Sequence, residues 1–179
     1  MIKEYAFGLA NRHHFGDTSD VSKYAGMSQD TFVSLWDYDA HVVDYVKEKG
    51  TLSGYDGILY MPDEFILDVD GSNPGNAKDK TIGLTIELDD LCIPYQLYFS
   101  GTGFHVGIPG NAFRWKPCPD LHLKVKDELQ ARGIYEYADS SVSDKTRIIR
   151  VVNTLNSKSN LWKIPITSSE LHESIDKIQ

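Results

Sequence analysis

Two aspartates, Asp68 and Asp70, lie two positions apart at the end of an apolar run in the stretch EFILDVDGSNPG. In a strand, residues two apart share a face, so both carboxylates point one way while Phe65, Leu67 and Val69 point into the core. Buried charge is costly unless it is paired or bound to a metal. At the rim of a sheet the pair suits Mg²⁺ or Mn²⁺, which favour carboxylates and share sites with phosphates. An exposed strand end is the alternative for so short a motif.

A glycine-rich turn follows in YFSGTGFHV, where Ser100 precedes Gly101, Thr102 and Gly103. Such a turn exposes several backbone N–H groups, which can form an anion-binding nest. His105 lies just inside the next strand, where its ring can donate a hydrogen bond to a phosphate oxygen. A plain hairpin turn beside a hydrogen-bonded histidine is the alternative for this motif alone.

A third set of polar residues lies in YADSSVSDKTRIIRVVNTLNSKSN. Asp139 follows an apolar run and offers a third carboxylate, with Asp144 as the alternative. Arg147 and Arg150 are three apart, which puts them on opposite faces of a straight strand, so a bulge or a strand end is needed for both to serve one site. Arginine suits bidentate phosphate binding, and Lys158 in the following turn adds a mobile charge.

Together these three sets indicate nucleotidyl transfer. Three carboxylates can bind two metal ions, and a glycine-rich turn, a histidine and several cations can bind a triphosphate. Two ions can activate an attacking hydroxyl and stabilise the leaving pyrophosphate. The protein itself mostly positions groups and neutralises charge in such reactions.

In combination and order, the motifs resemble those of the archaeo-eukaryotic primase superfamily, especially its compact primase–polymerases from phages, plasmids and other mobile elements. The family's apolar-Asp-x-Asp motif is matched by FILDVD, its SGxGFH motif by SGTGFHV, and its apolar-Asp motif by YAD. Its basic pair and following turn are matched by RIIRVVNTLNSKSNLWKIPI. The resemblance covers roughly residues 55–167. The distance from Asp139 to Arg147 is typical of the family, which favours Asp139 over Asp144.

The resemblance implies a metal site, a phosphate site and a fold. Two Mg²⁺ or Mn²⁺ ions would be held by Asp68, Asp70 and Asp139, which with His105 form the catalytic set. The phosphates would be bound by Ser100, Gly101, Thr102, Gly103, His105, Arg147, Arg150, Asn156 and Lys158. The implied fold has two α/β subdomains, one with an antiparallel sheet of the RNA-recognition-motif (RRM) type, and the active site lies in the cleft between them.

The implied activity is that of a DNA primase or polymerase in DNA replication. Its partners would be a single-stranded DNA template, a primer, nucleoside or deoxynucleoside triphosphates, and a replicative helicase acting in trans or within a longer chain. The sequence has no Cys/His zinc motif, so no zinc is expected, and primer extension is expected over primer initiation. Two alternatives stay open: a D-x-D glycosyltransferase, and a non-catalytic single-strand binder that retains the fold.

The elements that must position these residues follow from periodicity and from turn residues. Helices are expected over 19–26, 39–50, 77–91, 119–133 and 168–178, and strands over 57–62, 64–70, 94–100, 103–109, 147–154 and 161–166, the last two as a hairpin. This order predicts one α+β domain with a largely antiparallel sheet and helices on one side. Its parts are a helical or accessory segment over 1–54, a motif-bearing core over 55–167 and a C-terminal helix over 168–179.

Composition and net charge limit which partners and which cellular location are expected. The 179 residues carry a net charge of −8, yet the segment from Lys145 to Lys163 has five basic and no acidic residues. Such a patch can bind an anion, or it can be an ordinary solvated face of a strand. Two cysteines and no apolar run long enough to span a bilayer predict a cytoplasmic protein without membrane contact. The three tryptophans are expected to pack in the core, and His13 and His14 to lie on the surface or against template.

Overall fold

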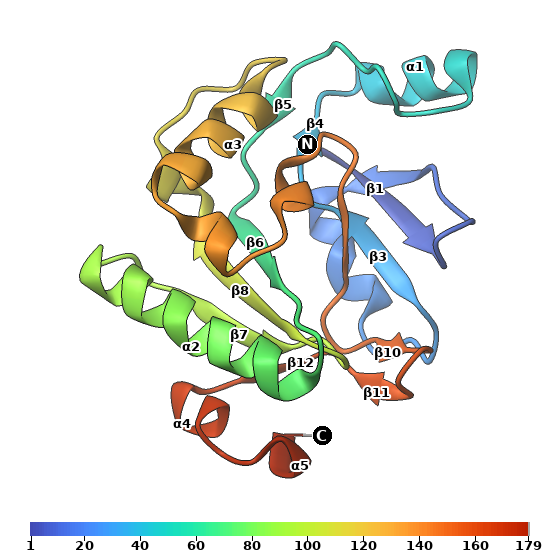
Figure 1. The fold of residues 1–179 in the computed structure, drawn as a ribbon. Coiled ribbons are helices and arrows are strands. Elements are labelled where there is room, and N and C mark those ends of the chain that lie inside the picture. Colours follow the sequence, from blue (N-terminus) through green and yellow to red (C-terminus); the bar gives the residue numbers. More distant parts are fainter. Residues whose placement is uncertain (179) are drawn as a thin grey trace.

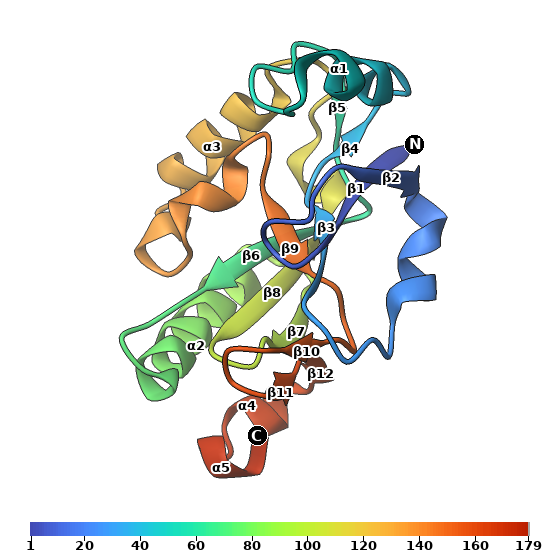
Figure 2. The same cartoon turned by 90° about the vertical axis from the view of Figure 1, so that its right-hand side faces the viewer.

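The computed structural model describes residues 1–178 and contains two main antiparallel sheets with helices packed around them (Figure 1). The chain forms most of the first sheet, then most of the second, and afterwards adds one strand to each. Figure 2 shows β9 of the first sheet beside β6 of the second, with the two sheets meeting along this line.

The first sheet has the strand order β5-β4-β1-β3-β9, with β2 paired to β1 at one end. Phe32 lies directly opposite Ala6 on one side and Arg150 on the other, so these three residues share one face. The bounds are β1 Ile2–Phe7, β2 His14–Asp17, β3 Thr31–Ser34, β4 Asp37–Tyr38, β5 Leu59–Tyr60 and β9 Ile148–Arg150.

The second sheet has the strand order β12-β7-β8-β6. Its hydrogen-bonded register places Asp68 opposite His105, so the first and second sequence motifs become neighbours on adjacent strands. The bounds are β6 Glu64–Val69, β7 Gln96–Phe99, β8 Phe104–Pro109 and β12 Ile164–Ile166, and a separate small hairpin is formed by β10 Leu155–Asn156 and β11 Leu161–Trp162.

The second sheet shares only part of the expected RRM arrangement. Its first three strands follow the order of an RRM, with the third strand between the first and the second. The last strand, β12, pairs with β7, whereas in an RRM it pairs with the first strand. The reason lies in the path of the chain, which joins the first sheet as β9 and returns beside the glycine-rich turn at the end of β7. The division into two subdomains stays a prediction.

Two long helices pack on this framework, and α2 covers one face of the second sheet (Figure 1). Helix α2 spans Pro74–Asp90 and begins three residues earlier than predicted, because Asn73 caps it by accepting a hydrogen bond from the Asn76 N–H at 2.9 Å. Helix α3 spans Leu121–Ala131 and buries Leu121, Val125 and Leu129. The remaining helices are α1 His41–Lys49, α4 Ser168–Leu171 and α5 Ile175–Ile178, with 3₁₀ helices η1 Thr18–Tyr24, η2 Gly110–Phe113, η3 Ile134–Glu136 and η4 Ser140–Ser143.

Of the two descriptions expected for 1–54, helical or accessory, the helical one does not hold for its first part, which supplies β1 to β4. The strand pattern of β1 is hidden because its inward-facing positions include a charged residue. Glu4 is fully buried, where Arg12 pairs with its carboxylate at an N–O distance of 2.6 Å and the His13 backbone N–H donates to it at 3.1 Å. Tertiary partners therefore allow a charge where periodicity predicts solvent.

The predicted hairpin of 147–154 with 161–166 does not form. Strand β9 pairs with β3 in the first sheet, and β12 pairs with β7 in the second. Only the short β10–β11 pair closes across the turn. A hairpin predicted from local turn signals was outcompeted by long-range pairing with apolar strands that lie far away in sequence.

Two further expectations need correction. The C-terminal helix breaks into α4 and α5, and the break falls where the Glu173 carbonyl accepts a hydrogen bond from Lys78 of α2. Among the tryptophans, Trp36 is fully buried against Phe65, but Trp115 is 44% exposed and Trp162 is 38% exposed. Trp115 donates to Glu128 at 2.8 Å, so a polar partner holds it at the surface. Within residues 1–178, no helix is both long and apolar enough to cross a membrane.

Candidate nucleotide and metal site

Asp68 lies near the end of β6 and is the most enclosed carboxylate of the predicted set. Its Oδ1 is 3.3 Å from His105 Nε2 on the neighbouring strand, and its Oδ2 accepts a hydrogen bond from Arg147. The Asp68 carbonyl accepts the Asp139 N–H at 2.8 Å, which ties the third motif to the first. The three sequence motifs therefore meet at Asp68.

Asp139, rather than Asp144, faces Asp68. Its side chain caps η4 by accepting the Ser141 N–H at 2.9 Å, and its Oδ2 lies 3.3 Å from Arg147 Nη1. Arg147 also donates to Ser141 Oγ at 2.6 Å. Asp144 is exposed and makes no ion pair within residues 1–178. The geometry thus agrees with the preference for Asp139.

Asp70 follows the last residue of β6 and is exposed at the rim. Its carboxylate makes no side-chain hydrogen bond or ion pair among the described residues, although its carbonyl accepts Lys80 Nζ at 3.1 Å. Partial burial and the negative charges of Asp68 and Asp139 raise the pKa of Asp70. A cation placed here would relieve that repulsion.

At pH 7 Asp68 is negatively charged and the ring of His105 is neutral. Burial alone would raise the pKa of Asp68, but its contacts with His105 and then with Arg147 lower it to about 2. Burial and the nearby Lys163 lower the pKa of His105 to about 4, so its ring is neutral at pH 7. A neutral ring contributes a dipole rather than a charge, which leaves Arg147 as the cation that balances Asp68.

The side chains of Asp68, Asp70 and Asp139 do not converge into the predicted metal site in this structure. In residues 1–178, no three His, Cys, Asp or Glu side chains converge closely enough to hold an ion. Arg147 bonds both Asp68 and Asp139, in the position where a cation would be attracted. The donor set itself fits a hard divalent cation, because it consists of carboxylate oxygens with Asp70 unpaired.

The SGTG turn requires both of its glycines. Gly101 has a φ of 96°, and a Cβ on it would lie 2.9 Å from Asn156 Cβ. A Cβ on Gly103 would lie 2.7 Å from the Val69 carbonyl oxygen. The turn is closed by Ser100, whose N–H donates to the Gly103 carbonyl at 2.9 Å and whose Oγ accepts the Gly103 N–H at 3.1 Å. That N–H is therefore used inside the turn.

Asn156 connects the glycine-rich turn to the basic segment. It is buried and donates from Nδ2 to the Ser100 carbonyl at 3.1 Å, while its Oδ1 accepts the Lys158 N–H at 3.1 Å. The Lys158 side chain is exposed, and its charge lowers the pKa of Asp70, in opposition to the stronger causes that raise it. Asn156 therefore fixes the turn, and Lys158 supplies positive charge nearby.

The two arginines reach one cavity because β9 begins at Ile148, so that Arg147 lies before the strand and Arg150 within it. Of the two possibilities that the sequence left open, a bulge or a strand end, the structure has a strand end. Arg150 also has local partners: it donates to Asp30 at 2.5 Å and to the Leu155 carbonyl at 2.7 Å.

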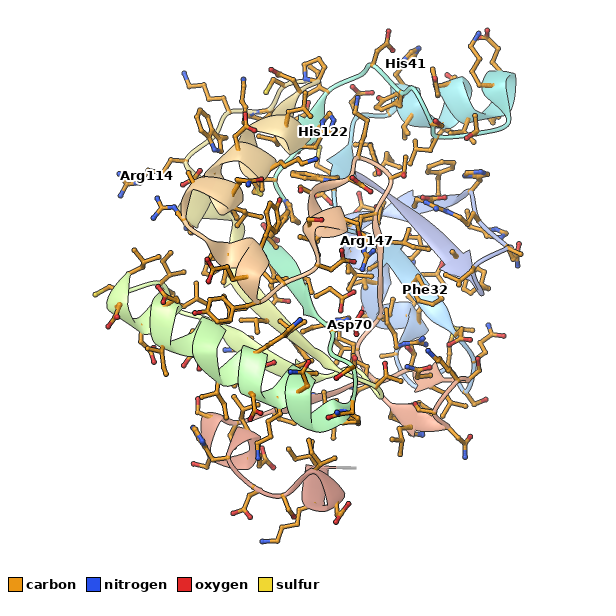
Figure 3. All side chains as sticks on the ribbon, viewed as in Figure 1. Phe32, His41, Asp70, Arg114, His122 and Arg147 are labelled. Carbon is orange, nitrogen blue, oxygen red and sulfur yellow. The ribbon has the colours of Figure 1, made fainter. Side chains whose placement is uncertain are left out.

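These residues line a cavity of about 390 Å³ where the two sheets meet. Figure 3 shows Asp70, Arg147 and Phe32 in this central part of the molecule, with Phe32 on β3. From the predicted site, the cavity contains Asp68, Asp70, Ser100, Thr102, His105, Arg147, Arg150 and Asn156. Leu9, Arg12 and Phe32 also line it but were not predicted, because they come from the N-terminal sheet and belong to no motif.

Sequence reasoning also missed Lys163, which is 1% exposed. Its Nζ donates to the Arg150 carbonyl at 2.8 Å and lies 4.9 Å from the centre of the Tyr98 ring. Burial lowers the pKa of Lys163 to about 7, an effect that Glu64 and Asp68 only partly offset. No signal in the sequence distinguishes this lysine from its exposed neighbours.

The Lys163→Met variant should therefore remove a pH dependence of stability. Because the folded-state pKa of Lys163 is about 7 and the unfolded value is 10.5, the unfolded chain binds more protons between these limits. The wild type should gain stability relative to the variant as pH rises from 7, by up to about 1.4 kcal/mol per unit. Urea unfolding at pH 6, 7.5 and 9 measures this, and a difference that is constant with pH would contradict it.

No protein-family model and no curated protein matches the sequence. Among solved structures, the fold is similar to the polymerase domain from Mycobacterium tuberculosis Ligase D, in a structure described as a complex with DNA, with a TM-score of 0.52 and 15% sequence identity. The match covers 83% of this chain and 57% of that chain, so this chain spans little more than half of its neighbour's length. At this identity, the comparison establishes that the two chains share a polymerase-like mixed α/β fold.

Proposed function

We propose that the protein is a template-dependent nucleotidyltransferase of the primase–polymerase type, which joins nucleoside triphosphates on single-stranded DNA. One observation carries the proposal: carboxylates of the first motif, polar side chains of the second motif and cations of the basic segment line one cavity. The shared fold with a polymerase domain supports it, and that domain's complex with DNA makes DNA a reasonable partner here.

In this proposal, Asp68, Asp70 and Asp139 hold two Mg²⁺ or Mn²⁺ ions. When bound, the ions would lower the pKa of the primer hydroxyl and neutralise charge on the triphosphate. Arg147 then exchanges its carboxylate partners for phosphate oxygens, for which its planar guanidinium is equally suited. The remaining groups, from the SGTG turn, Arg150 and Lys158, orient the triphosphate toward the carboxylates.

His105 has a separate role in the proposal. Its Nδ1 is buried without a hydrogen-bond partner among the described residues, while its Nε2 faces Asp68. Because the ring is neutral above pH 4, it can orient Asp68 or donate to a phosphate oxygen without adding charge.

An incorporation assay tests the proposal. The protein is incubated with single-stranded templates, with and without a primer, in Mg²⁺ or Mn²⁺, and with ribonucleotides or deoxynucleotides. We expect template-dependent extension of the primer, at a higher rate than synthesis without a primer. A parallel incubation with nucleotide sugars tests for glycosyl transfer. Metal-independent DNA binding with no turnover of any nucleotide would instead favour a non-catalytic single-strand binder.

A further inference from the structure

The cavity has a second wall, whose apolar side chains have no role in the phosphate and metal chemistry. Phe32 and Arg150 face the cavity from the first sheet, and Leu9 and Arg12 reach it from the β1–β2 loop. This wall comes from a different sheet than Asp68 and the SGTG turn. A ligand with its phosphates at the turn would therefore place its other end against the first sheet.

The chemistry of this wall is that of a stacking surface. Phe32 lies under the Arg150 guanidinium, with 4.8 Å between the guanidinium carbon and the ring centre. Its cross-strand neighbour on the other side is the small Ala6. The adjacent Val33 lines a different cavity on the opposite face of the sheet, so the orientation of Phe32 is set by strand alternation.

The β1–β2 loop is preorganised by hydrogen bonds of Arg12. Arg12 donates to both oxygens of the fully buried Glu4, at 3.1 and 2.6 Å, and to the Thr146 carbonyl at 2.9 Å. These bonds hold the loop against the segment that precedes Arg147. Leu9, in the same loop, is 73% exposed and still lines the cavity. An apolar side chain held in water beside an aromatic ring is suited to contact a flat apolar ligand.

We propose that Phe32 and Leu9 form the surface that receives the base of the nucleoside triphosphate, an inference that rests on the proposed function. Aromatic side chains and arginine planes stack on bases of any sequence, because every base has a π-face. Arg150 lies between this surface and the phosphate end, where it can contact both. A sugar ring would need hydroxyl partners, which neither Phe32 nor Leu9 offers.

Binding measured by calorimetry in Mg²⁺ separates the two ends of the cavity. ATP and dTTP probe the base and the phosphates, and inorganic tripolyphosphate probes the phosphates alone. We expect wild type to bind ATP more tightly than tripolyphosphate. Phe32→Leu should weaken ATP binding about fivefold or more and leave tripolyphosphate binding unchanged. Leu9→Ser should act in the same direction by a smaller factor, and its exposure makes it harmless to folding.

Phe7→Leu is the matched control, since it changes the same residue type on β1, where Phe7 contacts His14 and Tyr24. Its ATP affinity should equal that of wild type. Two results would overturn the proposed base-binding surface and leave the proposed function standing. One is an equal wild-type affinity for ATP and tripolyphosphate, and the other is unchanged ATP binding in both cavity variants. An equal loss of affinity for ATP and for tripolyphosphate in Phe32→Leu would also overturn the base-binding surface, because Phe32 would then act only through Arg150. Failure of wild type to bind either ligand would overturn the proposed function and this inference with it.

Discussion

Replacing Asp70 by asparagine should reduce metal-dependent nucleotide incorporation by about a thousandfold or more, which corresponds to the loss of several kcal/mol of transition-state stabilisation. The same change should leave the free energy of unfolding within about 0.5 kcal/mol of wild type, as for most surface substitutions. Asp70 is exposed, its carboxylate has no partner among the described residues, and its pKa is raised by burial and by Asp68 and Asp139. Its negative charge therefore does not stabilise the fold, because a raised pKa means that the folded state disfavours the charged form.

Paired measurements of primer extension and urea unfolding test this prediction. Asp144→Asn is the matched control, since Asp144 is an exposed carboxylate at the edge of the same cavity and lies outside the proposed metal set. It should retain activity. Full activity in Asp70→Asn, or a loss in Asp144→Asn equal to that in Asp70→Asn, would remove the present assignment of the metal ligands.

Arg147→Ala should have the second largest effect, and on two properties at once. Primer extension should fall about a hundredfold or more, the usual consequence of removing a group that stabilises developing charge. The metal-free protein should also lose roughly 1–3 kcal/mol of stability, because Asp68 is left enclosed without its cation. In the structure, Arg147 bonds Asp68, Asp139 and Ser141 together.

Metal binding distinguishes this dual role from a merely structural one. Since Arg147 competes with a cation for Asp68 and Asp139, its removal should tighten Mn²⁺ binding in the absence of nucleotide. The melting temperature of Arg147→Ala should then rise more with Mn²⁺ than that of wild type, because a ligand that binds only the folded state stabilises it by mass action. Arg132→Ala is a control, because within residues 1–178 the Arg132 side chain pairs with Glu128 of α3 alone. Equal Mn²⁺ responses in all three proteins would contradict competition at Arg147.

Local sequence patterns predicted the elements that carry the motifs. The alternation around Asp68 indicated a strand with Phe65, Leu67 and Val69 inward, and all three are fully buried in β6. The SGTG sequence indicated a tight turn between two strands, which β7 and β8 confirm. These predictions succeed because alternation and turn chemistry depend on residues that are close together in the chain.

The N-terminal strands of the first sheet and the pairing of β9 were not predicted by the same reasoning. Glu4 is a fully buried charge inside β1, and it is stable there because Arg12 and the His13 N–H fold back onto it. Strand β9 pairs with β3, more than 100 residues earlier in the chain, and not with the nearby strand expected from the turn. Pairing of this kind depends on contacts between distant segments, for which a single sequence gives no local signal.

The sequence by itself determined which chemical groups the protein offers: three acidic residues, a glycine-rich turn, a histidine and a basic segment, in a fixed order. Only the tertiary structure decided that Arg147 lies between Asp68 and Asp139, that Asp70 is left unpaired, and that Phe32 closes the cavity from the other sheet. The physical reason is that residue type and spacing fix local conformation and available chemistry. The partner of each charge depends on which distant strands pair, and the burial of their apolar faces selects that pairing.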